Sequence, residues 1–243
     1  MYQPRSYRRL VKSDDLVTYT VVEKETDLHI STLTDLSHEA RELVRRYRRD
    51  IESYIAREPF FAASLTPLAV LGDAPPIIKE MARASGLVGV GPMAAVAGAM
   101  AYFVGEELSR SSPEVIIENG GDIYLKGRKK RTVAIYAGSS PLSGRLGLEM
   151  DMSVTPVGIC TSSATVGPSL SFGKTDATVA IAPSATLADA TATAIGNAVG
   201  SIEEIGRGLE LAQNIPDLTG AVIIIGEKLG VWGSLKLCPL ESD

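Results

Sequence analysis

Cysteine and histidine are scarce in this sequence, which has two of each in 243 residues. Cys160 and Cys238 are too few for a disulfide framework, and neither lies near His29 or His38 at the spacing of zinc ligands. The composition therefore excludes a disulfide-rich scaffold and a structural zinc site. It favours a reducing compartment, so we expect a cytoplasmic protein.

The sequence also lacks a long basic region. Its net charge is −5, and lysine and arginine cluster most densely in "KGRKKR", residues 126–131. This cluster lies between the strand-like stretches "GGDIYL" and "RTVAIYAG", so we interpret it as the solvated tip of a hairpin. Because no basic surface could follow a phosphate backbone, nucleic acid is excluded as a partner.

No segment is strongly apolar over a long distance. The first 15 residues, "MYQPRSYRRLVKSDD", contain no apolar run of the kind found in signal peptides, so we do not expect export. Residues 86–105, "GLVGVGPMAAVAGAMAYFVG", are uncharged and long enough to cross a bilayer, but they are mostly alanine and glycine, which insert poorly. Since Pro92 suits a helix start, we predict a buried helix covered on all sides, and no membrane partner.

The first 64 residues predict an antiparallel meander followed by a helix. "YRRLV", "LVTYTVVEKE" and "LHISTL" alternate apolar and polar residues between turn-prone segments. Ser37 is expected to cap the helix. Residues at helical spacing predict its buried face: Ala40, Leu43, Val44, Tyr47, Ile51, Tyr54 and Ile55.

We interpret residues 65–243 as the core of a single domain that spans residues 1–243. They contain helices in "APPIIKEMARAS", after Pro92, and at about residues 184–199 and 202–214, with a buried strand in "PEVIIEN" and a loop in "SSPLSGRLG". "GAVIIIGEKLGVWGSLKL" predicts a buried strand, a tight turn and a return strand. Helix, apolar strand and hairpin thus occur twice, which favours an internal duplication. The predicted fold class is α+β, a largely antiparallel sheet with helices on one face.

Two nucleotide-binding patterns are incomplete. "GVGPMA", residues 89–94, has the glycine spacing of a dinucleotide-binding loop, but the "SGLV" before it is a poor strand. Anion binding at this helix start, with Gly91 as a contact, stays open because first-turn N–H groups lack helical partners. "GPSLSFGKT" resembles a P-loop, but its first glycine is one residue too early and strand-like residues follow it, so this pattern is excluded.

The segment "LADATATAIGN" places Asp189 and Thr193 four residues apart, on one face of a helix. Carboxylate and hydroxyl oxygens are suitable ligands for Mg²⁺. The alternative is structural: the helix dipole would favour Asp189, and Thr193 would bond back to a carbonyl. Spacing alone leaves both interpretations open.

Residues 160–197 are rich in serine and threonine, which indicates either a polar loop before a buried helix or a pocket lined with hydroxyl groups. In "ENGGD", residues 118–122, paired glycines between acidic residues favour either a β-bulge or a ligand site. Cys160 is either a reactive pocket thiol suited to sulfur chemistry or a small apolar residue at the end of a buried strand.

These motifs together resemble the ApbE family, in the order "GGDI" at residues 120–123, Gly127, "TSS" at residues 161–163 and "TVAIAPSATLADATATAIG" at residues 178–196. Members of that family are FAD:protein FMN transferases, and the resemblance, over about residues 86–200, implies that Asp189 and Thr193 bind Mg²⁺. "GVGPMAAVAGA", "ENGGDIYL", "CTSS" and "SFGK" are most similar to a short, cytoplasmic, uncharacterised ApbE-like family of anaerobes, which has been linked to sulfur incorporation into homocysteine.

The sequence departs from the ApbE pattern at two places. ApbE enzymes carry a His-Ile-Ile-Asp-Pro stretch whose histidine is implicated in catalysis, and here "SATVGPSLSFGKTDA" takes its place without a histidine. They also carry Lys-Gly-Tyr before the central helix, where this chain has "GVGPMA". Because a fold does not imply a function, flavin transfer is not inherited with the scaffold, and whether the protein is an enzyme stays open.

We therefore expect an ApbE-like protein that binds a phosphorylated or nucleotide ligand, with Mg²⁺ and with FAD or FMN as candidate cofactors. The alternative is a non-catalytic accessory protein in anaerobic sulfur assimilation, for homocysteine synthesis, with a protein partner. A homo-oligomer is also open. The expected ligand-binding residues are Gly91, Glu118, Asn119, Gly120, Gly121, Asp122, Thr161, Ser162, Ser163 and Lys174.

Overall fold

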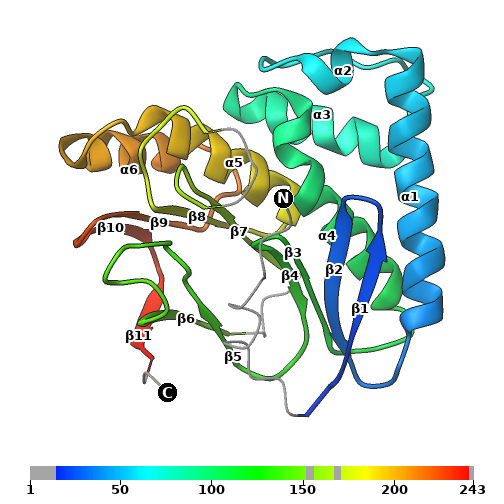
Figure 1. Cartoon of the computed structure of the whole chain (residues 1–243), viewed down its shortest axis with the longest axis horizontal. Coiled ribbons are helices and arrows are strands. Elements are labelled where there is room, and N and C mark those ends of the chain that lie inside the picture. The colour runs from blue at the N-terminus through cyan, green and yellow to red at the C-terminus, as the bar shows by residue number, and fades with distance from the viewer. Residues whose placement is uncertain (1–14, 152–155, 167–170, 241–243) are drawn as a thin grey trace.

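The computed structural model describes residues 15–151, 156–166 and 171–240. Helices form one layer, a large twisted sheet lies beneath them, and a small sheet packs on the far side of the large one (Figure 1). The predicted α+β class, with helices on one face of a largely antiparallel sheet, is confirmed. The predicted strand "YRRLV" lies outside the described residues.

The large sheet has eight strands in the order β1-β2-β3-β4-β7-β8-β9-β10, and all neighbouring pairs are antiparallel. Its strands are β1 Val17–Glu23, β2 Thr26–Thr32, β3 Val115–Asn119, β4 Asp122–Lys126, β7 Val157–Ser162, β8 Ala177–Ala182, β9 Gly220–Ile225 and β10 Lys228–Gly233. The small sheet has the order β11-β6-β5, with β5 Arg131–Ala134, β6 Leu146–Met150 and β11 Lys236–Pro239.

Successive side chains on the central strands belong to two different cores, because both faces of the large sheet are covered. Ile117, Tyr124 and Cys160 belong to the core under the helices. Ile116 and Ile159 belong to the core shared with the small sheet. Strand β8, "ATVAIA", is buried at all six positions, which explains its continuous run of small and β-branched residues.

The helices are α1 Ser37–Arg57, α2 Phe60–Ala63, α3 Pro76–Val88, α4 Val96–Leu108, α5 Ala185–Ala198 and α6 Ile205–Gln213, with 3₁₀ turns η2 Pro92–Ala95 and η3 Ile202–Glu204. The predicted apolar face of α1 is confirmed, since all seven residues are buried or packed against the core. The predicted Ser37 cap is wrong. Ser37 begins the helix, and its N–H donates to Asp35 Oδ1 at 2.8 Å because the aspartate precedes it by two residues.

Helix α4 occupies the centre of the helical layer, as its small residues predict. Gly98, Ala99, Ala101 and Gly105 are all buried along it. A Cβ atom at Gly105 would overlap the ring of Tyr124, so this glycine lets α4 lie directly on β4. Small side chains thus bring the backbone of α4 close to its neighbours.

Among the residues that the structure describes, no single helix is both long and apolar enough to cross a bilayer. The pair Pro76–Val88 and Pro92–Leu108 passes the length and composition test jointly, but is bent by 105°.

The hairpin predicted around the basic segment is wrong. The tight hairpin joins β3 to β4 instead, with Asn119 paired to Asp122 across the two-residue loop Gly120 and Gly121. Both glycines have positive φ, 71° and 109°, which such a loop requires and other residues rarely adopt. After β4 the chain crosses to the small sheet, where β5 pairs with β6.

The small sheet was not predicted. Its strand β6 begins at Leu146, within the predicted loop "SSPLSGRLG", and the predicted return strand after β9 is divided into β10 and β11. Gly233 separates the two with a φ of 96°, and a Cβ there would overlap the backbone of Thr219 and Gly220. The helix, strand and hairpin order does occur twice, but internal duplication is not shown.

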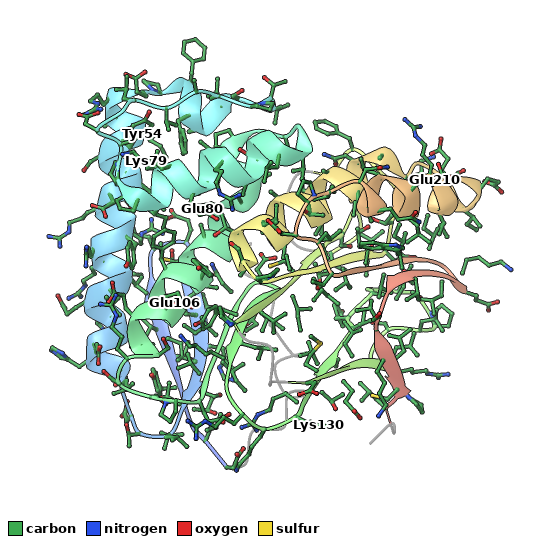
Figure 2. The ribbon with its side chains drawn as sticks, turned by 180° about the vertical axis from the view of Figure 1, so that it is seen from behind. Tyr54, Lys79, Glu80, Glu106, Lys130 and Glu210 are labelled. Carbon is green, nitrogen blue, oxygen red and sulfur yellow. The ribbon has the colours of Figure 1, made fainter. Side chains whose placement is uncertain are left out.

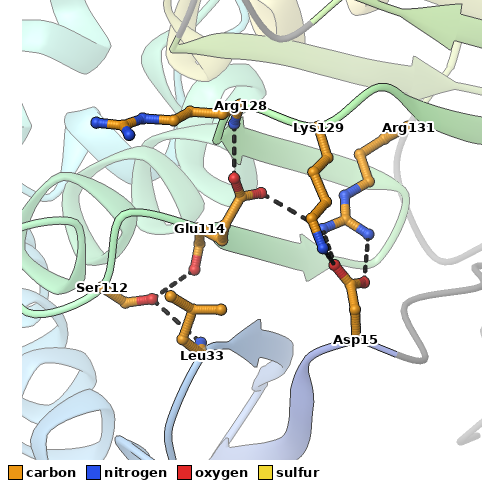
Figure 3. Close-up of polar contacts among 7 residues, drawn as sticks. All are labelled: Asp15, Leu33, Ser112, Glu114, Arg128, Lys129 and Arg131. Atoms are coloured by element: carbon orange, nitrogen blue, oxygen red, sulfur yellow. Dashed lines mark hydrogen bonds and ion pairs between the residues drawn. The ribbon is translucent and has the colours of Figure 1, made fainter.

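The basic segment is only partly solvated. Arg128, Lys129 and Lys130 are exposed, but the Arg131 side chain is 10% exposed and pairs with Asp15 at 2.7 Å and Glu114 at 3.4 Å (Figure 3). Arg131 and Lys129 hold the pKa of Asp15 well below its ordinary value, because both donate hydrogen bonds to its carboxylate. Figure 2 shows Lys130 near the lower edge of the molecule, away from helix α3 and its Glu80.

Candidate functional site

Helix α5 lies along β7, and several hydroxyl groups of the serine- and threonine-rich stretch are buried beneath it. At one end, Gly158 packs so closely on Ala185 that a Cβ at Gly158 would lie 2.5 Å from the Ala185 nitrogen. At the other end, Gly196 faces the buried hydroxyl groups of Ser162, Thr175 and Thr178. The Thr178 hydroxyl donates to Thr175 at 2.9 Å. These hydroxyl groups pack under α5.

Two carboxyl groups and one thiol lie close enough to interact electrostatically beneath the first turns of α5, and we call Asp122, Cys160 and Asp189 the acidic site. Ile123 pairs with Ile159 across β4 and β7, so the preceding Asp122 adjoins Cys160. Burial raises the pKa of the Asp189 carboxyl well above its ordinary value, and the Asp122 charge raises it further. Burial, Asp122 and Asp189 together raise the pKa of the Cys160 thiol. Three elements distant in sequence therefore contribute to one site.

The Asp189 carboxylate reaches the first turn of α4. Its Oδ2 atom accepts the Gly98 N–H at 2.8 Å. First-turn amides have no partner within their own helix, and no side chain caps α4 at its N-cap residue Ala95. Asp189 thus interacts with the N-terminal end of a neighbouring helix. Thr193 lies one turn further along α5 and is partly exposed.

Gly98 makes this contact sterically feasible. A Cβ at position 98 would lie 2.6 Å from the Asp189 Cβ and would overlap the Ala185 carbonyl. Gly98→Ala is therefore expected to lower the free energy of unfolding by about 1–3 kcal/mol, the usual cost of overpacking. Urea denaturation measures this, with Gly86→Ala as the control because a Cβ at Gly86 meets nothing within 4 Å. Equal stability of the two variants would contradict the close approach of α4 and α5.

The Gly120–Gly121 turn is tied to the start of α4. Glu118 Oε1 accepts the Gly121 N–H at 2.9 Å, and Asn119 Nδ2 donates to the Ala97 carbonyl at 3.0 Å. Because the turn is a regular two-residue hairpin loop, the β-bulge interpretation is wrong. Gly120 is exposed and Gly121 partly exposed, so a ligand could approach their backbone.

The other predicted ligand residues lie apart from the acidic site. Strand alternation directs Glu118 and Thr161 to the sheet face opposite the helices, with Ile116 and Ile159. Gly91 packs against the backbone of Ser64.

Two further candidates contact the loop that follows β7 or the end of α5. Ser163 Oγ accepts the N–H groups of Thr165 at 3.1 Å and Val166 at 3.0 Å, which fixes a local turn. The Lys174 side chain is exposed, and its N–H donates to the Val199 carbonyl at 2.9 Å. The "SFGK" motif, residues 171–174, thus packs against the C-terminal end of α5.

Two features of this region could not be predicted from local sequence patterns. Gly98 has no ligating side chain, and only the abundance of small residues in α4 signalled a close backbone approach. His29 pairs with Glu118 across β2 and β3, on the face opposite α5. No local pattern could reveal this pairing, because 89 residues separate the two.

The acidic site supplies part of the ligand set that a metal ion needs. Within residues 15–151, 156–166 and 171–240, no three His, Cys, Asp or Glu side chains form a ligand cluster. Asp189 and Thr193 nevertheless offer oxygen donors on one helix, with the Asp122 carboxyl nearby. Hard oxygen donors suit Mg²⁺, which commonly keeps waters and substrate phosphates as its remaining ligands.

Cys160 is completely buried, and its Sγ donates to the Ala185 carbonyl at 3.3 Å. Burial and two neighbouring carboxyl groups oppose the thiolate, which favours the structural interpretation of this residue.

We therefore expect Cys160 to be alkylated by iodoacetamide at pH 7 more slowly than an unfolded peptide thiol. A Cys238→Ser variant isolates it, since Cys238 is the other cysteine and is partly exposed. Mass spectrometry of timed samples measures the rate. Alkylation as fast as that of the peptide would instead favour a reactive thiol.

The fold is that of the ApbE flavin transferases. A structure described as Flavin Transferase ApbE from Vibrio cholerae superimposes with a TM-score of 0.60 at 13% identity, covering 92% of this chain and 98% of that one. The apo flavinyl transferase ApbE of Pseudomonas stutzeri superimposes with a TM-score of 0.55 at 15% identity, covering 91% and 94%. At such low identities the likeness defines the fold.

Sequence similarity identifies the family. A family profile described as AbpE bacteria matches residues 8–219, and the chain belongs to this family. A UPF0280 protein of Methanocella arvoryzae is 43% identical over 193 residues, covering 79% of this chain and 78% of that protein. A UPF0280 protein of Methanococcus aeolicus is 44% identical over 201 residues, with 81% of each covered. The predicted relation to an uncharacterised ApbE-like family is thus confirmed.

Proposed function

We propose that this protein binds a phosphorylated or nucleotide small molecule together with Mg²⁺ at the acidic site, with Asp189 and Thr193 as the metal ligands. The observation that carries the proposal is that Asp122, beside Cys160 on the neighbouring strand, and Asp189, which accepts the Gly98 N–H, lie within electrostatic reach of each other beneath α5. Two elements far apart in sequence supply them, so their proximity is a property of the fold.

Two neighbouring carboxyl groups, Asp122 buried and Asp189 only partly exposed, are unfavourable when both are ionised, because desolvation and mutual repulsion act together. A divalent cation would remove both penalties. Asp189 and Thr193 would hold it, and Asp122 would contribute a second negative charge beside it. Such an ion would neutralise the charge of a ligand phosphate.

Flavin nucleotides are the first ligands to test. The ApbE structures with this fold are described as flavin transferases, and the Gly120–Gly121 turn is open at the start of α4. FAD and FMN each carry the phosphate groups that a metal-assisted site would take. We also propose that the protein is located in the cytoplasm and forms a homo-oligomer.

An accessory role in anaerobic sulfur assimilation, with a protein partner, stays a prediction from the family resemblance. The UPF0280 relatives of Methanocella arvoryzae and Methanococcus aeolicus come from methanogens. The buried Cys160 thiol is not an accessible sulfur nucleophile for such a role, whereas Cys238 is partly exposed.

The proposal is tested by calorimetry and visible spectroscopy. FAD or FMN, titrated into the protein with and without Mg²⁺, should bind more tightly when the metal is present and should show a shifted flavin absorption band. Asp189→Asn should remove the metal dependence. If the titrations show neither a heat of binding nor a shift of the flavin absorption band, with or without Mg²⁺, flavin is excluded as the ligand.

A further inference from the structure

A single peptide group links the Gly120–Gly121 turn to the acidic site. Asn119 Nδ2 donates to the Ala97 carbonyl at 3.0 Å, and the Gly98 N–H donates to Asp189 Oδ2 at 2.8 Å. The Ala97 carbonyl and the Gly98 N–H belong to the same planar amide. The Asn119 amide on one side and the Asp189 carboxylate on the other therefore hold one rigid group between them.

We propose that Asn119 is a positioning residue, which orients the Ala97–Gly98 peptide group and through it the Asp189 carboxylate. The inference rests on the proposed role of Asp189 as a metal ligand. It assigns Asn119 a task different from direct ligand contact.

The location of Asn119 supports this role. The residue is 9% exposed, it ends β3, and it pairs with Asp122 across the hairpin. Asp122 is the second carboxyl of the acidic site. The backbone of Asn119 thus fixes Asp122 in register while its side chain fixes the peptide group that binds Asp189.

The chemistry of the linkage favours an effect on Asp189. A donor on a peptide carbonyl polarises the amide and strengthens the hydrogen bond that its N–H donates. In α4 the Gly98 N–H lies in the first turn, where it has no helical acceptor of its own. The Asp189 carboxylate therefore depends on a peptide group that Asn119 helps to hold.

Metal ligands oriented by outer hydrogen bonds commonly lose about 10- to 100-fold in metal affinity when the outer partner is removed. Asn119→Leu keeps a similar volume but cannot donate to Ala97. We expect it to raise the Kd for Mn²⁺, measured by titration calorimetry, within that range.

The matched control is Asn214→Leu. Asn214 directly follows α6, and its Nδ2 donates to the Glu210 carbonyl at 2.8 Å. Like Asn119, it makes a hydrogen bond from a side-chain amide to a helix carbonyl. This variant should leave the Mn²⁺ affinity unchanged. An equal loss in both variants would overturn the proposal.

Nuclear magnetic resonance of the metal-free protein separates this inference from the proposed function. Asn119→Leu should shift the Gly98 amide and Asp189 ¹³Cγ resonances and accelerate exchange of the Gly98 N–H, while amides further along α4 keep their positions. Unchanged Gly98 and Asp189 resonances would overturn the positioning role whatever the metal does. Wild-type protein that binds no Mn²⁺ would refute the proposed function, and the resonance test would still decide the role of Asn119.

Two measurements protect the test against a misfolded variant. Asn119→Ser is smaller, and its hydroxyl is too short to reach Ala97, so it should repeat the shifts. In wild-type protein the Asn119 side-chain amide protons should exchange slowly with solvent. Rapid exchange of these protons would show that the bond to Ala97 does not persist, and the proposal would fail.

Discussion

Millimolar Mg²⁺ or Mn²⁺ is expected to raise the Tm of the wild-type protein, and Asp189→Asn to abolish the increase. A ligand that binds only the folded state stabilises it by about 2.7 kcal/mol at a concentration 100 times its Kd. Asparagine keeps an oxygen that can accept the Gly98 N–H, but it carries no charge for a cation. The variant should therefore fold and lose the metal response.

The pH dependence sharpens this prediction. Since the folded state raises the pKa of Asp189, it holds that proton more tightly than the unfolded chain does. The contribution of Asp189 to stability is thus fully present below its ordinary pKa and is lost as the pH rises through its raised pKa. Without metal, wild-type protein should lose stability across that window relative to Asp189→Asn. Because Mg²⁺ competes with the proton, its stabilising effect should grow over the same window.

Asp176→Asn is the matched control for Asp189→Asn. Asp176 also accepts a backbone N–H, that of Gly226 at 2.7 Å, and it lies outside the acidic site. This variant should keep the full metal-induced increase in Tm. Calorimetric scans of the three proteins, with and without Mg²⁺, measure the differences. A wild-type protein whose Tm and calorimetric titrations do not respond to either cation, even with FAD present, would exclude the metal site.

Local patterns predicted the elements but not the way in which strands combine. The apolar stripe of α1 and the small residues of α4 each carry their own signal, and both were confirmed. The crossing from β4 to β5 has no such signal, because "DIYL" and "RTVA" suit either a hairpin or two separate sheets. In the structure, Gly127 lies at this crossing, and a Cβ there would overlap the Glu114 carboxylate.

The site shows the same division. The sequence placed Asp189 and Thr193 on one helix face, since that follows from helical spacing. Asp122 and Cys160 were candidates by their own motifs, but no pattern in the sequence related them to Asp189. Their proximity depends on the register of β4 and β7 and on the packing of α5. The roles of Gly98 and of the Asn119 amide could not be predicted from the sequence. A backbone N–H is present at nearly every position, and only the packing of the chain decides which one contacts a given side chain.

The protein is expected to transfer FMN from FAD to a protein acceptor far more slowly than an ApbE enzyme does, even if it binds flavin. Transfer requires an acceptor hydroxyl to attack the pyrophosphate of FAD, with charge neutralised near the phosphates and a base to accept the proton. The resemblance to ApbE implies a histidine between Thr161 and Asp189, and this chain has none there.

Other residues are poorly placed to act as that base. His38 is exposed in the first turn of α1, and His29 lies on the sheet face opposite α5. Asp176 accepts hydrogen bonds from Thr165 and Gly226, and Glu118 from Gly121.

General-base catalysis contributes about 10²- to 10⁴-fold to such rates, so we expect a loss of that order relative to an ApbE control. The measurement is mass spectrometry of an acceptor that carries the ApbE target motif, incubated with FAD, Mg²⁺ and either this protein or the ApbE control. A parallel incubation without FAD controls for other modifications. Because slow transfer could also reflect weak FAD binding, the assay is run above the calorimetric Kd. An acceptor heavier by one FMN at the rate of the ApbE control would show that the missing histidine is not needed and that a carboxyl group on this scaffold accepts the proton.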